Sequence, residues 1–568
     1  MTQKAETIIL RGATIIDGTG TPARTGDVTV AGGRIVGAAA SGAAAAGAAA
    51  SGAAASGASA SGAPAGALEL DCSGLVVAPG FIDIHSHSDF SLFLDPGAPN
   101  YVAQGVTLLV NGNCGTSGAP IDAKDPLTAQ IIGDERILRL ITWSSFAEYM
   151  ETLDRLPKAV NLAALVGHVN ARVTALGVSD RRPDDRELEV MKAVVREAMS
   201  AGAFGLSTGL IYPPGVFAAT EELIELARVV AEVAGDDNGL YASHLRSESD
   251  QLLAAVQEAV RIGQASRTRV QVSHHKAAGR RNWGLVRTSL DLMEDSRRQG
   301  AEVTCDVYPC VAGATGLLAL FPPWTHQRGK DGFMAFLKDP EARVRIKREV
   351  SRPMKGSANL LFDAGLDGVR VADSRVFPQY LGKSLADIAR AGGVAPAPAA
   401  GADPTPGAPL DVLLDLAERD FDLGITLFSM SEADVRHVLA HRLSCVGADA
   451  AVPIPGEGLP HPRTYRAFTR TLATYARDER VISLEQAIHK MTGFPAWKLG
   501  LPDRGVVRPG AKADLAVFDL WGLRAGSDFD DPHHLSEGMV HVLVNGEFVI
   551  RDGKMTGAKP GALVRRPT

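Results

Sequence analysis

Gly80-Phe-Ile-Asp-Ile-His85-Ser-His87-Ser-Asp89 is a short apolar run that ends in two histidines one residue apart. The run from Leu75 to Ile84 predicts a buried strand, with Pro79-Gly80 as a break inside it. Because side chains alternate along a strand, His85 and His87 are expected to point to the same side. Two imidazoles at one strand end favour a divalent-metal site, and a pair of buried, hydrogen-bonded histidines is the alternative for this motif alone.

Further strand-like runs follow the first, and amphipathic segments separate several of them. The eight candidate strands are 77–85, 106–111, 162–167, 204–208, 240–244, 270–274, 303–308 and 443–449. Helices are predicted at 186–201, 221–234, 249–265 and 288–299. Eight strand–helix units with parallel strands predict an α/β fold, a (β/α)8 TIM-like barrel, with a doubly wound sheet as the competitor. Polar residues at nearly every strand end favour the barrel, because barrel active sites form there.

Both chain ends consist of short strand-like runs that are separated by Gly and Asp residues. We therefore predict one small β-sandwich domain made from residues 1–78 and 504–568, beside a barrel at 79–503 that carries an insertion between its strands 7 and 8. Residues 38–67 are rich in Ala, Gly and Ser, and 394–409 in Ala, Pro and Gly. Both lack side chains large enough to build a core and are predicted to be flexible loops.

Charge and cysteine content restrict the class of protein. The 568 residues carry a formal net charge of -7, which argues against a nucleic-acid or anionic-membrane partner. The start of the chain lacks the apolar region of a signal peptide, and no apolar run reaches membrane-spanning length. Five widely spaced cysteines are not a disulfide framework, so we expect a cytoplasmic protein with reduced thiols.

Later strand ends carry further metal-binding side chains. Cys114 follows the second strand, His244 ends the fifth, His274 and His275 end the sixth, and Asp449 ends the eighth. A thiolate, several imidazoles and a carboxylate form a donor set that suits Zn²⁺. Each residue alone could be a satisfied buried polar group, but their matching positions at one barrel mouth favour a shared site.

Several motifs together resemble a known family. They are Pro79-Gly-Phe-Ile-Asp-Ile-His-Ser-His-Ser-Asp, Gly112-Asn-Cys-Gly, Gly205-Leu-Ser-Thr-Gly-Leu-Ile-Tyr-Pro-Pro-Gly, Ser243-His-Leu-Arg-Ser-Glu, Ser273-His-His-Lys, Asp306-Val-Tyr-Pro, His461-Pro-Arg and Gly505-Val-Val-Arg-Pro-Gly. The chain resembles the amidohydrolase superfamily, in its N-acyl-D-amino-acid deacylase (D-aminoacylase) branch. The likeness covers nearly the whole chain except the two low-complexity segments, and Gly112-Asn-Cys-Gly is the motif that indicates the branch.

The resemblance implies a ligand set. Cys114, His244 and His274 are similar to the ligands of a tightly held zinc, and a second, weaker metal position is implied at His85, His87 and Asp449. Many superfamily relatives bridge two metals with a carboxylated lysine at the fourth strand, which here ends Leu206-Ser-Thr-Gly without one. Cys114 would supply the missing anionic ligand, so one catalytic zinc is expected.

The resemblance also implies an activity: hydrolysis of the linear amide of small N-acyl-D-amino acids, with Asp449 as general base and then general acid. Lys276, Tyr308, Tyr212 and Arg463 resemble the groups that hold the substrate carboxylate and backbone. Two alternatives stay open: a cyclic-amide hydrolase of the hydantoinase or dihydroorotase kind, and a non-catalytic barrel that acts as a scaffold. This chain departs from the family pattern at two places: it has Ala448 where the family usually has a serine before the aspartate, and Cys310 and Ala314 where relatives more often have an aromatic residue and a serine. These differences leave the identity of the preferred D-amino acid undetermined.

Overall fold

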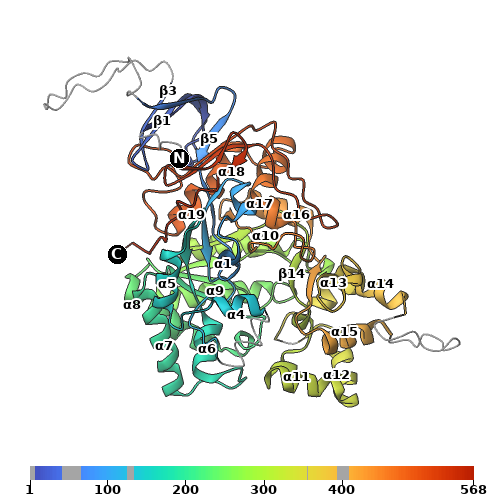
Figure 1. Cartoon of the computed structure of the whole chain (residues 1–568). Coiled ribbons are helices and arrows are strands. Elements are labelled where there is room, and N and C mark those ends of the chain that lie inside the picture. The colour runs from blue at the N-terminus through green and yellow to red at the C-terminus, as the bar shows by residue number, and fades with distance from the viewer. Residues whose placement is uncertain (1–6, 41–65, 125–133, 355, 393–407, 568) are drawn as a thin grey trace.

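The computed structural model describes residues 7–40, 66–124, 134–354, 356–392 and 408–567 (Figure 1). Its centre is a ring of parallel strands, as the sequence predicts. In ring order they are β6 (Phe81–Asp83), β7 (Val106–Asn111), β8 (Asn161–Ala164) continued by β9 (Val166–Gly167), β10 (Gly205–Gly209), β11 (Leu240–His244), β12 (Arg269–Val272), β13 (Val303–Val307) and β17 (Ser444–Val446). A parallel bridge between Ser86 and Ala450 joins the ends of the first and last strands and closes the barrel.

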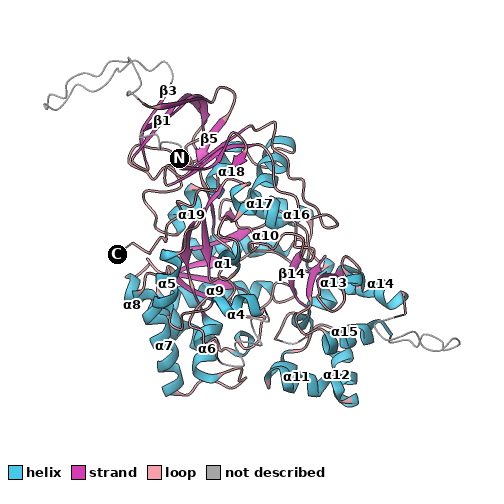
Figure 2. Ribbon diagram, viewed as in Figure 1, coloured by secondary structure: helices cyan, strands magenta, loops and turns pink. Residues whose placement is uncertain are grey.

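Helices surround this ring (Figure 2). The four helices predicted from the sequence are α7 (Asp185–Ser200), α8 (Thr220–Ala234), α9 (Leu252–Ser266) and α10 (Leu285–Arg298). The start of α7 is fixed by a capping box, in which Asp184 and Glu187 satisfy each other's backbone N–H groups. The others are α1 (Ser91–Leu94), α2 (Pro99–Val102), α4 (Glu135–Leu140), α5 (Phe146–Arg155), α6 (His168–Leu176), α16 (Glu432–Ala440), α17 (Arg463–Arg470), the π-helix η6 (Thr471–Asp478), α18 (Leu484–Met491) and α19 (Gly493–Lys498).

Strands from both chain ends form one sheet, drawn at the top of Figure 1. They are β1 (Thr7–Ile15), β2 (Arg24–Ala31), β3 (Arg34–Ala40), β4 (Leu68–Asp71), β5 (Val76–Pro79), β18 (Leu515–Phe518), β19 (Met539–Val544), β20 (Glu547–Arg551) and β21 (Lys554–Met555). The central pairing is antiparallel, between β5 and β18, and so joins the two ends directly. The division into domains at 78 and 504 stays a prediction.

The predicted strand 77–85 is two strands, because the chain changes sheets at Gly80. β5 pairs with β18 of the small sheet, whereas β6 pairs with β7 of the barrel. A Cβ at Gly80 would lie 2.3 Å from Thr107 Oγ1, so only glycine allows this close passage. β6 ends at Asp83, and His85 and His87 therefore lie beyond the strand rather than within its alternation.

Between β13 and β17 the chain builds a separate cluster, drawn at the lower right of Figure 1. A three-stranded antiparallel sheet is accompanied by short helices and has a hydrophobic core of its own. The elements are β14 (Gly313–Gly316), α11 (Gly329–Lys338), α12 (Pro340–Val350), α13 (Leu360–Gly368), β15 (Val369–Asp373), α14 (Leu385–Arg390), α15 (Ala408–Arg419) and β16 (Gly424–Leu427).

The predicted loops at 38–67 and 394–409 lie mostly outside the described residues. Where they are described, their boundaries were set too wide: β3 continues to Ala40, and α15 begins at Ala408. Among the described helices, none has the length and apolar character needed to cross a bilayer. All five cysteines are buried and free, in agreement with the absence of a disulfide framework.

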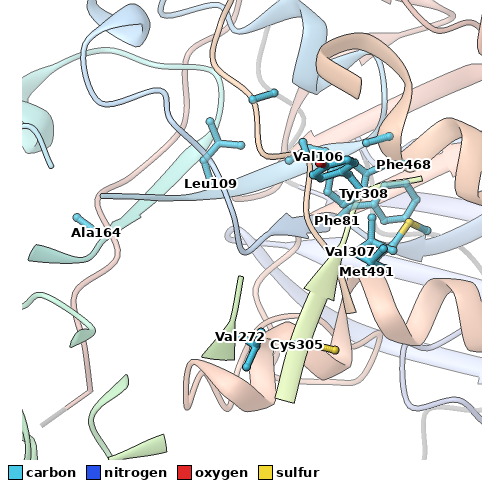
Figure 3. Packing of buried hydrophobic residues seen from close by; sticks show 14 of the residues in the cluster. Phe81, Val106, Leu109, Ala164, Val272, Cys305, Val307, Tyr308, Phe468 and Met491 are labelled. Atoms are coloured by element: carbon cyan, nitrogen blue, oxygen red, sulfur yellow. The ribbon is translucent and has the colours of Figure 1, made fainter. Parts of the chain in front are cut away.

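The main hydrophobic core connects the barrel with its helices. Figure 3 shows Phe81 and Phe468 close together, and their rings stack at a centroid distance of 6.0 Å. Tyr308 and Met491 belong to the same cluster of buried side chains. This packing ties the barrel strands to the helices around them, while the loops at the strand ends remain free to carry polar side chains.

Candidate metal centre

Every metal ligand predicted from the sequence lies at the C-terminal mouth of the barrel. Cys114 follows β7, His244 is the last residue of β11, and His274 and Asp449 follow β12 and β17. The backbone φ angles of Cys114, His274 and Asp449 are +51°, +36° and +50°. Such angles are rare for residues with a side chain, and they cluster where a fold holds functional groups in a required direction. Here the tight turns bring donor atoms of three different strand ends together.

Four of these side chains form one compact group. The metal-binding atoms of His85, Cys114, His274 and Asp449 all lie within 4.8 Å of one another. Cys114 Sγ is 3.3 Å from His85 Nε2 and 3.4 Å from His274 Nε2. Asp449 Oδ1 is 3.0 Å from His87 Nε2 and 3.5 Å from His85 Nε2.

A second, overlapping group contains His244, Glu248 and His274. His244 is buried, yet neither of its ring nitrogens has a hydrogen-bond partner among the described residues. A buried polar atom without a partner is costly, and a metal ion would satisfy it. Thiolate, imidazole and carboxylate donors in a buried cluster fit a zinc-like cation.

The charges around the cluster keep the side chains of Cys114 and Asp449 ionised. Burial alone would raise the pKa of the Cys114 thiol, but the neighbouring His85 and His274 outweigh it and hold that pKa well below its ordinary value. Burial also opposes ionisation of Asp449, and Arg463 and His85 reverse this and keep the pKa of its carboxyl well below the usual range. Both residues are therefore available as anions at neutral pH.

Behind the ligands, two carboxylates orient the imidazoles. Asp306 Oδ1 lies 3.1 Å from His85 Nδ1 and accepts the backbone N–H of His274 at 2.8 Å. Glu248 Oε1 lies 2.9 Å from His274 Nδ1 and 2.6 Å from Lys276 Nζ. Lys276 Nζ also lies 2.8 Å from His274 Nδ1, so the Nδ1 atoms of both imidazoles are engaged and their Nε2 atoms are left facing Cys114.

The residues predicted to bind substrate surround the same space. Arg463 Nη1 is 2.9 Å from Asp449 Oδ2, and its guanidinium lies 4.4 Å from the centre of the Tyr308 ring. Lys276 lies 5.5 Å from the same ring. The ring of Tyr212 is 5.0 Å from that of His244. His275, by contrast, turns away and pairs with Ser289 of α10 at 2.8 Å.

One cavity of about 380 Å³ joins these groups. Nine of the ten predicted site residues line it: His87, Cys114, Tyr212, His244, His274, Lys276, Tyr308, Asp449 and Arg463. The tenth, His85, is fully buried beneath it, in contact with Cys114. The cavity is large enough for a small organic molecule.

Two features of the site were not predicted. Glu248 and Asp306 were not proposed as site residues, although both lie in motifs that carry the family resemblance. The grouping of ligands also differs, because the compact group takes His85 and Asp449 together with Cys114 and His274. The signal that could have shown Glu248 is its position four residues after His244 at the same barrel mouth.

Comparison with known proteins identifies the family. A model described as "Amidohydrolase family" matches residues 68–550. The chain belongs to the amidohydrolase family. The predicted membership and the barrel fold are thereby confirmed.

Two curated relatives of this amidohydrolase come from Alcaligenes xylosoxydans xylosoxydans. N-acyl-D-aspartate deacylase is 35% identical over 559 residues, covering 98% of this chain and 94% of the relative. D-aminoacylase is 33% identical over 560 residues, covering 98% and 97%. A solved structure of N-acyl-D-glutamate deacylase from Bordetella bronchiseptica, complexed with zinc and a phosphonate that mimics the tetrahedral intermediate, is 32% identical with a TM-score of 0.77, covering 99% of this chain and 100% of that one.

Proposed function

We propose that this amidohydrolase cleaves the linear amide of N-acyl-D-amino acids in a zinc-dependent reaction, giving a carboxylate and a D-amino acid. The activities of its relatives support the reaction class, since proteins that match almost the whole chain are named N-acyl-D-amino-acid deacylases. The observation that carries the proposal is the position of Asp449, which belongs to the metal-binding cluster and also pairs with Arg463 at the same cavity.

Cys114, His244 and His274 are proposed as the ligands of one tightly held zinc, and His85, His87 and Asp449 as a second, weaker position. The zinc in the related structure supports the choice of metal. When bound, the metal supplies an activated water at neutral pH and polarises an amide carbonyl. His85 lies against both Cys114 and Asp449, so the two positions adjoin.

Asp449 is proposed as the catalytic base and acid. Its Oδ2 is held by Arg463, which leaves Oδ1 toward the imidazoles of His85 and His87, at the edge of the metal cluster. There the carboxylate accepts a proton from the attacking water and returns it to the nitrogen of the leaving amine. Asp449 is buried, and shielding from bulk water strengthens its electrostatic interactions with Arg463 and with the two imidazoles.

The substrate carboxylate is proposed to bind at Arg463 and Lys276, with Tyr308 and Tyr212 beside it. A guanidinium offers two parallel hydrogen bonds to a carboxylate. Because Tyr308 lies under both cations, its ring limits the directions in which they can approach a ligand. The five buried, free cysteines suit a reducing compartment, and we propose the cytoplasm as the location.

The test is a metal count combined with a stereochemical assay. The protein is purified without added metal, zinc per chain is measured, and N-acetyl-D- and N-acetyl-L-amino acids are assayed with and without a chelator. About one zinc per chain and chelator-sensitive release of D-amino acids are expected. Zinc without cleavage of either enantiomer, together with hydrolysis of a hydantoin, would refute the linear-amide proposal in favour of a cyclic-amide hydrolase.

A further inference from the structure

The wall of the cavity beyond the metal cluster is mostly apolar. It is formed by side chains of the barrel loops and of the segment between β13 and β17: Val169, Val178, Ile211, Ala314, Leu360 and Leu427. Such a wall lowers the local dielectric constant and makes any unpaired charge expensive. The part of a ligand that lies against it must therefore be uncharged.

Only two lysine or arginine side chains of the described residues line this cavity, Lys276 and Arg463. Each already faces a carboxylate of the protein, since Lys276 pairs with Glu248 at 2.6 Å and Arg463 with Asp449 at 2.9 Å. The two cations can share one carboxylate of a ligand between them. Among the described residues, no third lysine or arginine lines this cavity to neutralise a second carboxylate of the ligand.

An adjoining outer cavity of about 680 Å³ shares Val178 and Pro213 with the inner one, and its lysine and arginine lie among a larger number of carboxylates. Its Arg375 pairs with Asp134 at 2.8 Å, and its Lys330 lies 4.7 Å from the centre of the Phe421 ring. Its wall also holds further carboxylates, those of Asp373, Asp420 and Asp422. Carboxylates therefore outnumber lysine and arginine in the outer cavity, which opposes the approach of an additional anion.

We infer that this site selects substrates with a single negative charge: N-acyl-D-amino acids whose side chain and acyl group are both uncharged and apolar. The inference rests on the proposed deacylase function and narrows it. A D-aspartate or D-glutamate side chain would place a second carboxylate against the apolar wall without a partner. The preference therefore differs from that named for the N-acyl-D-aspartate deacylase that is 35% identical to this chain.

Leu360 and Ala314 are the specificity-determining positions of this wall. Leu360 begins α13, Ala314 lies in β14, and both are only partly buried, so a longer side chain can be accommodated there. An arginine at either position would add the missing cation to the wall. It would then form a charge-assisted hydrogen bond with a second substrate carboxylate.

The experiment compares pairs of substrates that differ in charge at nearly constant size, using the zinc-loaded full chain. N-acetyl-D-methionine is paired with N-acetyl-D-glutamate, and N-acetyl-D-asparagine with N-acetyl-D-aspartate. We expect kcat/KM to be on the order of 100-fold higher for the neutral member of each pair. Leu360→Arg and Ala314→Arg should each narrow this ratio by about 10-fold or more, whereas Leu360→Gln, with similar length and no charge, should leave it unchanged.

The outcomes separate the two proposals. Equal or faster hydrolysis of the acidic members by the wild-type protein would overturn the inference while supporting the deacylase function. A best rate with N-acetyl-D-lysine would also overturn it, because the outer carboxylates would then select a cation. Absence of hydrolysis of every N-acetyl-D-amino acid by zinc-loaded protein would refute the deacylase function itself and the inference with it.

Discussion

Arg463 and Asp449 form a buried ion pair in which Nη1 lies 2.9 Å from Oδ2. The other carboxylate oxygen, Oδ1, faces His87 at 3.0 Å. The two oxygens of Asp449 thus have different partners: one is tied to a residue proposed to bind substrate, and the other points to the metal cluster. This division suits a group that must stay ionised and in place while it exchanges a proton.

Asp449→Asn should abolish turnover, because an amide cannot accept the proton from water. The amide keeps nearly the same shape, and the three tight ligands, Cys114, His244 and His274, are unchanged, so zinc should stay bound. We expect kcat to fall by about 10²- to 10⁴-fold, the range of general acid–base contributions, with a zinc content equal to that of the wild type. Asp154→Asn, at an exposed ion pair with Arg565, is the matched control. Activity near the wild-type level in Asp449→Asn would contradict the assigned role.

Glu248→Gln should weaken both the fold and the metal site. Glu248 is buried and contacts Lys276 Nζ at 2.6 Å and His274 Nδ1 at 2.9 Å. Leaving a buried lysine without its carboxylate costs about 3–5 kcal/mol of stability, and loss of such a contact to a ligand weakens metal binding about 10- to 100-fold.

Thermal unfolding and zinc competition with a chelator measure these two effects of Glu248→Gln. Glu457→Gln is the control, since its pair with Arg136 is exposed and worth about 0–1 kcal/mol. Unchanged zinc affinity in Glu248→Gln would show that His274 does not depend on this carboxylate for its orientation.

Gly561→Val should destabilise the protein through its C-terminal segment. The segment runs beside the barrel, where Gly561 N–H donates to Lys158 O and Val564 N–H to Leu162 O. A Cβ at Gly561 would lie 2.1 Å from Val160 O, a backbone atom that cannot move aside freely. We expect a loss of about 1–3 kcal/mol, typical of overpacking, measured by urea unfolding. Gly316→Val, where a Cβ meets nothing within 4 Å, should change stability by much less.

The barrel was predictable because parallel strands covered on both faces read as continuous apolar runs. The predicted run at 77–85 was nevertheless two strands, since hydrophobicity does not reveal whether Val77 pairs with β18 or a barrel strand. The ligand types followed from strand-end positions and motifs. The grouping of the ligands could not be predicted, because it depends on the positive backbone φ angles of Cys114, His274 and Asp449. Nor could the contact of Glu248 with Lys276, because it joins the loops that follow two different strands.

Lys498→Met should change how stability depends on pH. Lys498 is fully buried and its Nζ lies 2.9 Å from Glu302 Oε1. Burial lowers the pKa of Lys498 from 10.5 to about 8, with Glu302 opposing the shift only in part. Between these two values the unfolded chain binds more protons than the folded one, so the contribution of Lys498 to stability rises with pH in this window.

Methionine has a similar length and no charge, so Lys498→Met removes this rise. The wild type should gain about 1–2 kcal/mol relative to the variant between pH 8 and pH 9.5, from a limiting slope of about 1.4 kcal/mol per pH unit. The urea unfolding midpoints of the wild type and of Lys498→Met are measured at pH 7.5, 8.5 and 9.5. Titrations of other groups affect both proteins equally, so they cancel in the difference between the two. Lys559→Met, at an exposed position, should run parallel to the wild type. A Lys498→Met curve that is also parallel would show that Lys498 keeps its proton in the folded state throughout this range.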